Sequence, residues 1–254
     1  MTTPRVTALY EKIGPSYAAQ RVADPRLADV LHDALGDARR VLDVGAGTGS
    51  YEPAGTAVVA LDASTAMLGE RPSGAAPAVA GRAERLPFAD GAFDAVMAVL
   101  TVHHWEDRVA GYRELRRVAP RRVVLTYEPA VHNRQWVVAH YVPEIAALDE
   151  RRAGFSVDEV AAGIGARTRV IEVPVPWDCT DGFIMAFWRR PEAFLDPAVR
   201  AATSGFTAVD ARAVDRGMAQ LRADLASGAW EARHGHLRAR SEFDAGLRLL
   251  IAED

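Results

Sequence analysis

Short apolar runs alternate along this chain with segments in which apolar residues recur at helical spacing. Each run is bounded by Gly, Pro or Asp, which is typical of buried strands. The expected strands cover residues 40–44, 57–61, 78–81, 93–99 and 122–127. The expected helices cover about 6–35, a short stretch after the N-cap Ser64, and about 107–118. Strands and helices that alternate across short loops predict an α/β fold with a parallel sheet and right-handed crossovers.

A glycine-rich turn follows the first expected strand. Gly45, Gly47 and Gly49 are spaced G-x-G-x-G, so the backbone can approach a ligand where a Cβ would collide. Ser50 stands where the dinucleotide fingerprint G-x-G-x-x-G needs its last glycine, and residues 50–56 leave almost no room for a pyrophosphate-binding helix. The sequence also lacks the P-loop pattern G-x-x-x-x-G-K. The turn therefore favours a nucleoside ligand that carries no phosphate groups.

Asp62 ends the second expected strand, where an acid can accept hydrogen bonds from two adjacent ribose hydroxyls. A ligand with a ribose and no phosphates points to S-adenosylmethionine as the cofactor. A nicotinamide oxidoreductase is the weaker alternative, because its cofactor needs the missing phosphate-binding helix.

The composition limits the class of protein and its partners. The 254 residues are 49% hydrophobic and 25% charged, with a net charge of −4, as in an ordinary globular domain. The basic residues form no block, so we expect neither a nucleic-acid partner nor a membrane partner. The single cysteine, Cys179, excludes an intramolecular disulfide, and the first residues carry no apolar signal region, so we expect a cytoplasmic protein. No His, Cys and Asp spacing predicts a metal site, and the oligomeric state stays open.

A series of motifs in the first half of the chain resembles the class I S-adenosylmethionine-dependent methyltransferases of the type 11 group. This group includes the ubiquinone and menaquinone C-methyltransferases, and the resemblance covers roughly residues 10–130. The motifs, in order, are Leu42-Asp43-Val44-Gly45-Ala46-Gly47-Thr48-Gly49, Ala60-Leu61-Asp62-Ala63-Ser64, Met67-Leu68, Gly81-Arg82-Ala83-Glu84, Leu86-Pro87-Phe88, Phe93-Asp94-Ala95-Val96, Val102-His103-His104-Trp105 and Glu114-Leu115-Arg116-Arg117-Val118. Each motif alone is weak evidence, but their common order and spacing are specific.

The resemblance implies a seven-stranded, mostly parallel Rossmann-like sheet with helices on both faces. It adds a sixth strand at about 168–175 and an antiparallel seventh at about 245–251. We expect a single domain over residues 1–254, with an N-terminal helical segment over 1–36 and a helical insertion or cap over 176–243 between strands 6 and 7.

The resemblance also implies which residues bind the cofactor. They are Tyr17, Arg21, Asp43, Gly45, Ala46, Gly47, Asp62, Ala63, Met67, Ala83, Glu84 and Val99. Tyr17 and Arg21 would share a helix face and close over the cofactor, with the guanidinium on its carboxylate, or that face would simply be solvated. Asp43 would hold the methionine amino group or be a buried turn carboxylate, and Met67 would contact the adenine or pack in the core. Arg82 departs from the family's frequent acid, so backbone atoms or Glu84 would accept from the adenine amino group.

Methyl transfer from a sulfonium needs alignment, exclusion of water and, for some acceptors, removal of a proton. His104 and His103 follow the fourth strand and are the candidate bases, although this segment can also be purely architectural. Candidate acceptor-binding residues are Glu128, His132, Phe183 and Trp188, the last two being equally suited to a cap core. We therefore expect methyl transfer to a small-molecule acceptor. The alternative is a protein that binds S-adenosylmethionine or S-adenosylhomocysteine without transfer, as a regulatory or structural partner.

Overall fold

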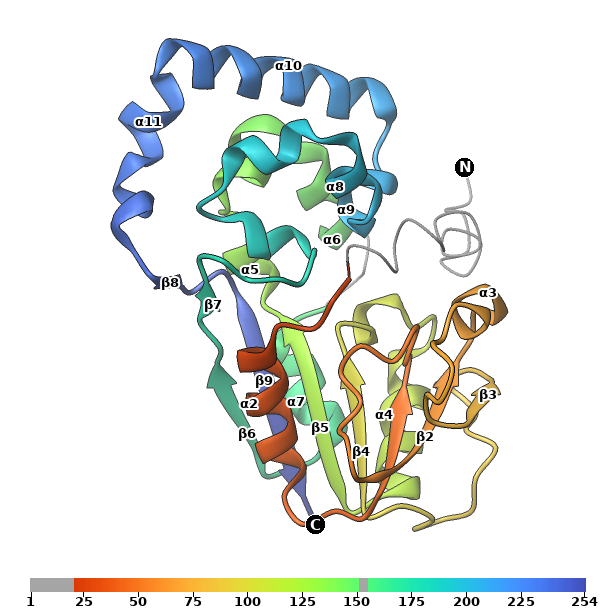
Figure 1. The fold of residues 1–254 in the computed structure, drawn as a ribbon. Coiled ribbons are helices and arrows are strands. Elements are labelled where there is room, and N and C mark those ends of the chain that lie inside the picture. Colours follow the sequence, from red (N-terminus) through yellow and green to blue (C-terminus); the bar gives the residue numbers. More distant parts are fainter. Residues whose placement is uncertain (1–20, 151–154) are drawn as a thin grey trace.

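A single seven-stranded sheet forms the base of the molecule (Figure 1). The computed structural model describes residues 21–150 and 155–254. The strands are β1 (Arg40–Val44), β2 (Ala57–Asp62), β3 (Ala78–Ala80), β4 (Ala95–Val99), β5 (Arg121–Tyr127), β6 (Thr168–Glu172) and β9 (Leu247–Glu253). Their order is β3-β2-β1-β4-β5-β9-β6, and β9 is antiparallel to both of its neighbours. The predicted fold class is confirmed.

The expected sixth strand is shorter than predicted. β6 ends at Glu172, and the chain then forms β7 (Val175–Pro176), which pairs with β8 (Glu242–Phe243) as a separate two-stranded ribbon. This ribbon lies where the chain leaves the sheet and where it returns to β9.

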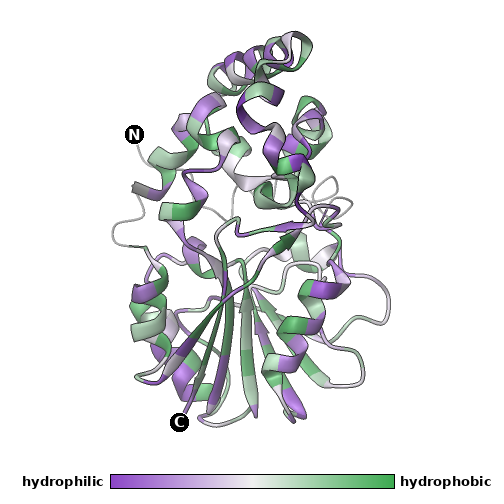
Figure 2. Cartoon of the chain, turned by 90° about the vertical axis from the view of Figure 1, so that its left-hand side faces the viewer, coloured by the Kyte–Doolittle hydropathy of each residue, from purple (hydrophilic) through white to green (hydrophobic). Residues whose placement is uncertain are grey.

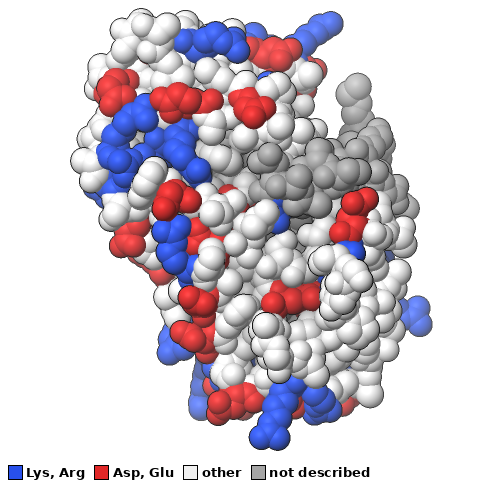
Figure 3. All heavy atoms as spheres, viewed as in Figure 1, with Lys and Arg blue, Asp and Glu red and all other residues white. Residues whose placement is uncertain are grey.

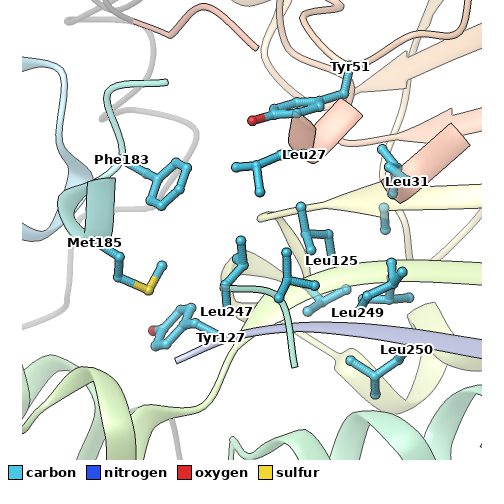
Figure 4. Packing of buried hydrophobic residues seen from close by; sticks show 14 of the residues in the cluster. Leu27, Leu31, Tyr51, Leu125, Tyr127, Phe183, Met185, Leu247, Leu249 and Leu250 are labelled. Atoms are coloured by element: carbon cyan, nitrogen blue, oxygen red, sulfur yellow. The ribbon is translucent and has the colours of Figure 1, made fainter. Parts of the chain in front are cut away.

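Helices cover both faces of the sheet (Figure 2). They are α2 (Pro25–Leu35), α3 (Thr65–Gly69), α4 (Arg108–Val118) and α7 (Val157–Ile164). Their N-caps are short polar side chains that accept a backbone N–H of the first turn, Asp24, Ser64, Asp107 and Ser156. The core lies between these helices and the sheet, where Leu27 and Leu31 of α2 point toward Leu125 and Leu249 (Figure 4).

The helix expected over 6–35 begins, among the described residues, only at Pro25. Proline is favoured in the first turn of a helix, and Asp24 caps that turn. Arg21, four residues before, instead forms an isolated antiparallel bridge with Asp181. The expected helical position of Arg21 was therefore wrong.

A helical cap stands over the carboxyl ends of the strands, and two separate parts of the chain build it (Figure 1). The second part was expected and holds η4 (Ile184–Phe187), η5 (Pro191–Leu195), α8 (Pro197–Ala201), α9 (Ser204–Thr207), α10 (Ala211–Ser227), α11 (Ala229–His234) and η6 (Gly235–Ala239). The first part was missed and holds α5 (Pro129–His132), η2 (Val137–Tyr141), η3 (Pro143–Ile145) and α6 (Ala146–Glu150).

The two parts of the cap share one core. Trp136 from the first part packs edge to face against Phe194 and Trp230 from the second, with ring centroids 5.7 and 5.4 Å away. Gly217 of α10 lies so close to η2 that a Cβ there would stand 2.2 Å from the Tyr141 carbonyl oxygen. The cap is therefore packed as a unit.

Basic and acidic side chains are interspersed over the visible surface (Figure 3). Many of them form pairs, such as Arg238 with Glu192 and Glu231. None of the helices in the described ranges combines the length and the apolar character needed to cross a bilayer.

Candidate functional site

A cavity of about 170 Å³ opens at the carboxyl ends of β1, β2 and β4. The register brings these ends level, because Val44 pairs with Leu61 and Asp43 pairs with Met97. Of the twelve predicted cofactor residues, eleven line this cavity: Arg21, Asp43, Gly45, Ala46, Gly47, Asp62, Ala63, Met67, Ala83, Glu84 and Val99. The twelfth, Tyr17, lies outside the described residues.

The turn after β1 is bent tightly onto β2. The backbone N–H groups of Gly45 and Ala46 both donate to the Leu61 carbonyl oxygen, at 2.7 and 3.1 Å. Gly45 has φ +76°, and a Cβ on it would lie 2.1 Å from Oγ1 of Thr101. Glycine is therefore required here both by the backbone conformation and by the close approach of the loop after β4.

Asp62 joins the end of β2 to this turn. Its Oδ2 accepts the Gly47 N–H at 2.8 Å, and its Oδ1 accepts the Ser64 N–H at 2.7 Å. Burial raises the pKa of the Asp62 carboxyl, and the backbone donors oppose that rise. Each carboxylate oxygen keeps a second lone pair, so the group can still accept hydrogen bonds from two hydroxyls in the cavity.

Asp43 is a buried acid that borders the same cavity. No donor in the described parts of the chain reaches its Oδ1, although the atom is shielded from solvent. Burial, followed by the charge of Glu52, raises the pKa of the Asp43 carboxyl well above its usual range, while Arg71 opposes the rise. An ammonium group would supply both the missing donor and the missing positive charge. A nucleoside that carries an amino-acid tail, as S-adenosylmethionine does, fits these residues.

Arg21 does not lie on a helix, and its partner is a cap residue. Its Nε donates to Oδ1 of Asp181 at 2.5 Å and its Nη2 donates to Oδ2 at 3.3 Å. The hydroxyl of Tyr51, in the short segment after the glycine turn, donates to the same Oδ2 at 2.8 Å. Tyr51 and Asp181 both line the cavity. Neither residue was predicted to line the cofactor cavity, and 130 residues separate the two in sequence.

Part of the cavity lining is apolar. Met67 and Ala83 are buried and line it, together with Ala63 and Val99. Glu84 also lines it, but its Oε1 accepts the backbone N–H of Glu106 at 2.9 Å, just before α4. Glu84 is therefore already engaged on one oxygen in holding the loop after β4.

Leu100 follows β4 with a strained backbone. Its φ of +51° is the only positive value for a residue other than glycine among those described, and its N–H donates to the Leu125 carbonyl oxygen at 2.7 Å. Such strain in a branched residue persists only where surrounding contacts impose it, and it is common at functional sites. Leu100 lines both this cavity and a second one, and no sequence signal indicated it.

The second cavity, of about 70 Å³, lies between the sheet edge and the cap. It shares Arg21, Leu100 and His104 with the first cavity. Its other lining residues are His103, Tyr127, His132, Ile145, Leu148, Asp149, Phe183, Ile184, Met185, Thr203, Ser204 and Gly205. The predicted His104 thus stands at the boundary of the two cavities, and His103 lies against it, with ring centroids 3.9 Å apart.

A buried polar group forms part of the wall of the second cavity. The Tyr127 hydroxyl donates to Oδ1 of Asp149 at 2.6 Å, and His132 Nδ1 lies 3.5 Å from Oδ2 of the same carboxylate. His132 was predicted to bind the acceptor, whereas Tyr127 and Asp149 were not predicted. Asp149 belongs to the first part of the cap, which was not expected. No group of three His, Cys, Asp or Glu side chains within the described ranges is arranged to hold a metal ion.

Two of the predicted acceptor residues line neither cavity. Glu128 is the N-cap of α5, where its Oε1 accepts the Ala130 N–H at 3.3 Å. Trp188 is fully buried: its Nε1 donates to the Val175 carbonyl oxygen at 3.0 Å and its ring stacks on Phe243. Trp188 thus belongs to the cap core, which its large apolar ring favours, and of the two predicted aromatics only Phe183 reaches the cavity.

Residues 42–125 match the family model described as a methyltransferase domain. The demethylmenaquinone methyltransferase of Mycolicibacterium vanbaalenii is 44% identical over 88 residues, which cover 33% of this chain and 39% of that protein. The enzyme of the same name from Renibacterium salmoninarum is 36% identical over 126 residues, covering 44% and 53%. The chain thus spans only two fifths to about half of the length of these relatives.

A solved structure matches almost the whole fold. It is a protein from Anabaena variabilis, assigned as a methyltransferase of an antibiotic biosynthesis pathway, with a TM-score of 0.86 and 29% identity over 92% of this chain and 99% of its own. An S-adenosylmethionine-dependent methyltransferase from Thermotoga maritima shares the fold at a TM-score of 0.58 and 13% identity, over 97% and 98% of the two chains.

Proposed function

We propose that this chain is a class I S-adenosylmethionine-dependent methyltransferase of the type 11 group, which transfers a methyl group from S-adenosylmethionine to a small-molecule acceptor. The observation that carries the proposal is the pair of acids at the ends of adjacent strands. Asp43 presents an oxygen that no donor of the described residues reaches, and Asp62 presents oxygens held in place by backbone N–H groups, on one cavity.

The chain's residues have separate tasks in this proposal. Asp43 would bind the ammonium group of the cofactor, Asp62 would accept from the ribose hydroxyls, and Met67 and Ala83 would enclose the adenine. When bound, the cofactor supplies an electrophilic methyl group on a sulfonium. Gly47 would let the backbone lie against it, while Gly45 leaves room for the Thr101 side chain behind the turn.

The second cavity is the proposed acceptor site. Its wall combines the apolar side chains Phe183, Ile184 and Met185, from the second part of the cap, with the polar side chains His132 and Asp149, from the first part. This suits a small acceptor with an apolar body and a polar group. Most of the lining lies outside residues 42–125, the part of the chain that matches the family model. The identity of the acceptor therefore does not carry over from the relatives, whether demethylmenaquinone or a compound of an antibiotic pathway.

His104 is the proposed base for an acceptor that carries a proton on its nucleophile. Among the described residues it is one of three that border both cavities, and the other two are a leucine and an arginine, which cannot accept a proton at neutral pH. His103, packed between His104 and the Tyr127 ring, would position it. We further propose that the chain acts in the cytoplasm as one domain, with the cap closing the acceptor site.

Calorimetric titration tests the proposal. The protein should bind S-adenosylhomocysteine, the expected product, and should not bind NAD, since Ser50 and the short segment after the glycine turn leave no phosphate-binding helix. Binding of NAD without binding of the thioether nucleoside would overturn it.

A further inference from the structure

Residues 21–24, here called the strap, run from the cofactor cavity to the start of α2 and lie along residues 178–181 of the cap. The contacts between them repeat along the strap. Arg21 forms the backbone bridge with Asp181, Ala23 accepts from the Thr180 hydroxyl at 3.4 Å, and Asp24 accepts the Thr180 N–H at 3.1 Å. The cap is therefore joined to the cofactor cavity at this junction.

On the cap side of this junction, Asp181 is the described residue that reaches the cavity. It is 1% exposed, and its carboxylate receives the Arg21 guanidinium on both oxygens and the Tyr51 hydroxyl on Oδ2. All three residues line the first cavity. A second hydrogen bond, from the Ser50 hydroxyl to the Arg21 carbonyl oxygen at 2.8 Å, holds the strap backbone to the segment after the glycine turn.

These groups line the same cavity as Asp43, and Glu52, the residue after Tyr51, is near enough for its charge to act on Asp43. An ammonium group beside Asp43 would favour its ionised form, and the charges of the lining are then negative at Asp43, positive at Arg21 and negative at Asp181. This sequence of charges complements a zwitterionic amino-acid group, which carries one ammonium and one carboxylate. The Tyr51 hydroxyl stays protonated and can donate to Asp181, because burial and the Asp181 charge raise the pKa of this hydroxyl far above the usual range.

We propose that Asp181 is a positioning residue for the amino-acid tail of the cofactor: from the cap, it fixes Arg21 and Tyr51 in the geometry that binds this tail. The assignment rests on the proposed function and goes beyond it, because it makes a cap residue part of the cofactor site. A further consequence is that the cap junction contributes to tail recognition and leaves the nucleoside half of the site to the sheet.

Two probes that differ only in the tail test this assignment. S-adenosylhomocysteine carries the amino-acid tail, and 5′-methylthioadenosine is the same thioether nucleoside without it. Asp181→Asn removes the charge at nearly constant shape. We expect its affinity for S-adenosylhomocysteine to fall at least tenfold, with affinity for 5′-methylthioadenosine within about twofold of the wild type. Tyr51→Phe, which removes one donor, should show the same selectivity with a smaller loss.

Asp178→Asn is the matched control. Asp178 lies three residues before Asp181 in the same junction and pairs with Arg26 at 2.9 Å, but it does not line the cavity. This variant should bind both probes as the wild type does.

The outcomes separate the assignment from the proposed function. Equal losses for both probes in Asp181→Asn would mean that Asp181 only supports the fold, and no loss for either would mean that it does not serve the tail; both results overturn the assignment alone. Wild-type protein that binds neither probe would overturn the proposed function, and the assignment with it. Unchanged 5′-methylthioadenosine binding also shows that the variant is folded.

Discussion

The backbone N–H of Gly47 donates to Oδ2 of Asp62 at 2.8 Å, so the glycine turn after β1 and the end of β2 hold each other in place. Fifteen residues separate the two in sequence, yet both line one cavity. The acid that is proposed to bind the ribose is thus positioned by the turn that is proposed to accommodate the rest of the cofactor.

Replacing Asp62 should therefore weaken cofactor binding. Asp62→Ala leaves two ribose hydroxyls and the Gly47 N–H without their acceptor, and we expect affinity for S-adenosylhomocysteine to fall by about 1.5–3 kcal/mol in calorimetry. Asp94→Ala is the control, because Asp94 likewise accepts two backbone N–H groups, from Arg39 and Arg40, but at the far end of β1. Equal affinities of the Asp62 variant and wild type would contradict the ribose assignment.

Gly45 is expected to tolerate no side chain. In Gly45→Ala the Cβ would stand 2.1 Å from Oγ1 of Thr101, in addition to the strain of φ +76°. Gly55 has the same φ of +76° but open space around it, so Gly55→Ala measures the strain alone, about 1–2 kcal/mol. Urea unfolding should show a clearly larger loss for Gly45→Ala than for Gly55→Ala. Similar losses would mean that the Thr101 loop yields freely.

The buried Asp43 should make the ligand-free protein less stable as pH rises. Its pKa is raised in the folded state, so between the unfolded value of about 3.8 and the raised folded value the folded protein holds the extra proton. The unfolded state then binds fewer protons, and the free energy of unfolding falls as pH increases. Asp43→Asn cannot ionise, so its stability relative to wild type should increase as the pH rises from about 3.8 toward the raised folded pKa, while its affinity for S-adenosylhomocysteine decreases.

The decisive quantity is the slope, against pH, of the difference in unfolding free energy between Asp43→Asn and wild type. The Asn amide adds a pH-independent cost of its own, which changes this difference by the same amount at every pH and leaves its slope unchanged. A difference in urea midpoint that stays constant over this pH range would show that Asp43 does not titrate there.

Phe183 and Trp188 should respond in opposite ways. Phe183 lines the second cavity, so Phe183→Ala should raise the KM for the acceptor, once one is identified, and leave S-adenosylhomocysteine affinity within about twofold. Trp188 is fully buried in the cap, so Trp188→Ala should cost about 3–5 kcal/mol of unfolding free energy. Thermal unfolding and steady-state kinetics together distinguish the two, and an unchanged KM in the Phe183 variant would argue against the cavity as acceptor site.

The sequence alone determined the sheet and the turn that follows its first strand. Buried parallel strands appear as short continuous apolar runs, and glycines at alternate positions mark a close backbone approach, so both features are local and visible without a structure. The family resemblance supplied the cofactor residues from Asp43 to Val99, and they share one cavity because the ends of parallel strands meet at one edge.

The tertiary structure decided what lies above that edge. The cap joins residues 129–150 to residues 177–241 through contacts such as Trp136 on Trp230, and its short helices have no periodic signal strong enough to place them. The pairing of Arg21 with Asp181 spans 160 residues, and only packing of the cap against the strap brings it about. Whether an aromatic side chain lines a cavity, as Phe183 does, or fills a core, as Trp188 does, depends on contacts between distant segments. Hydrophobicity is the same in both cases, so the sequence could not distinguish them.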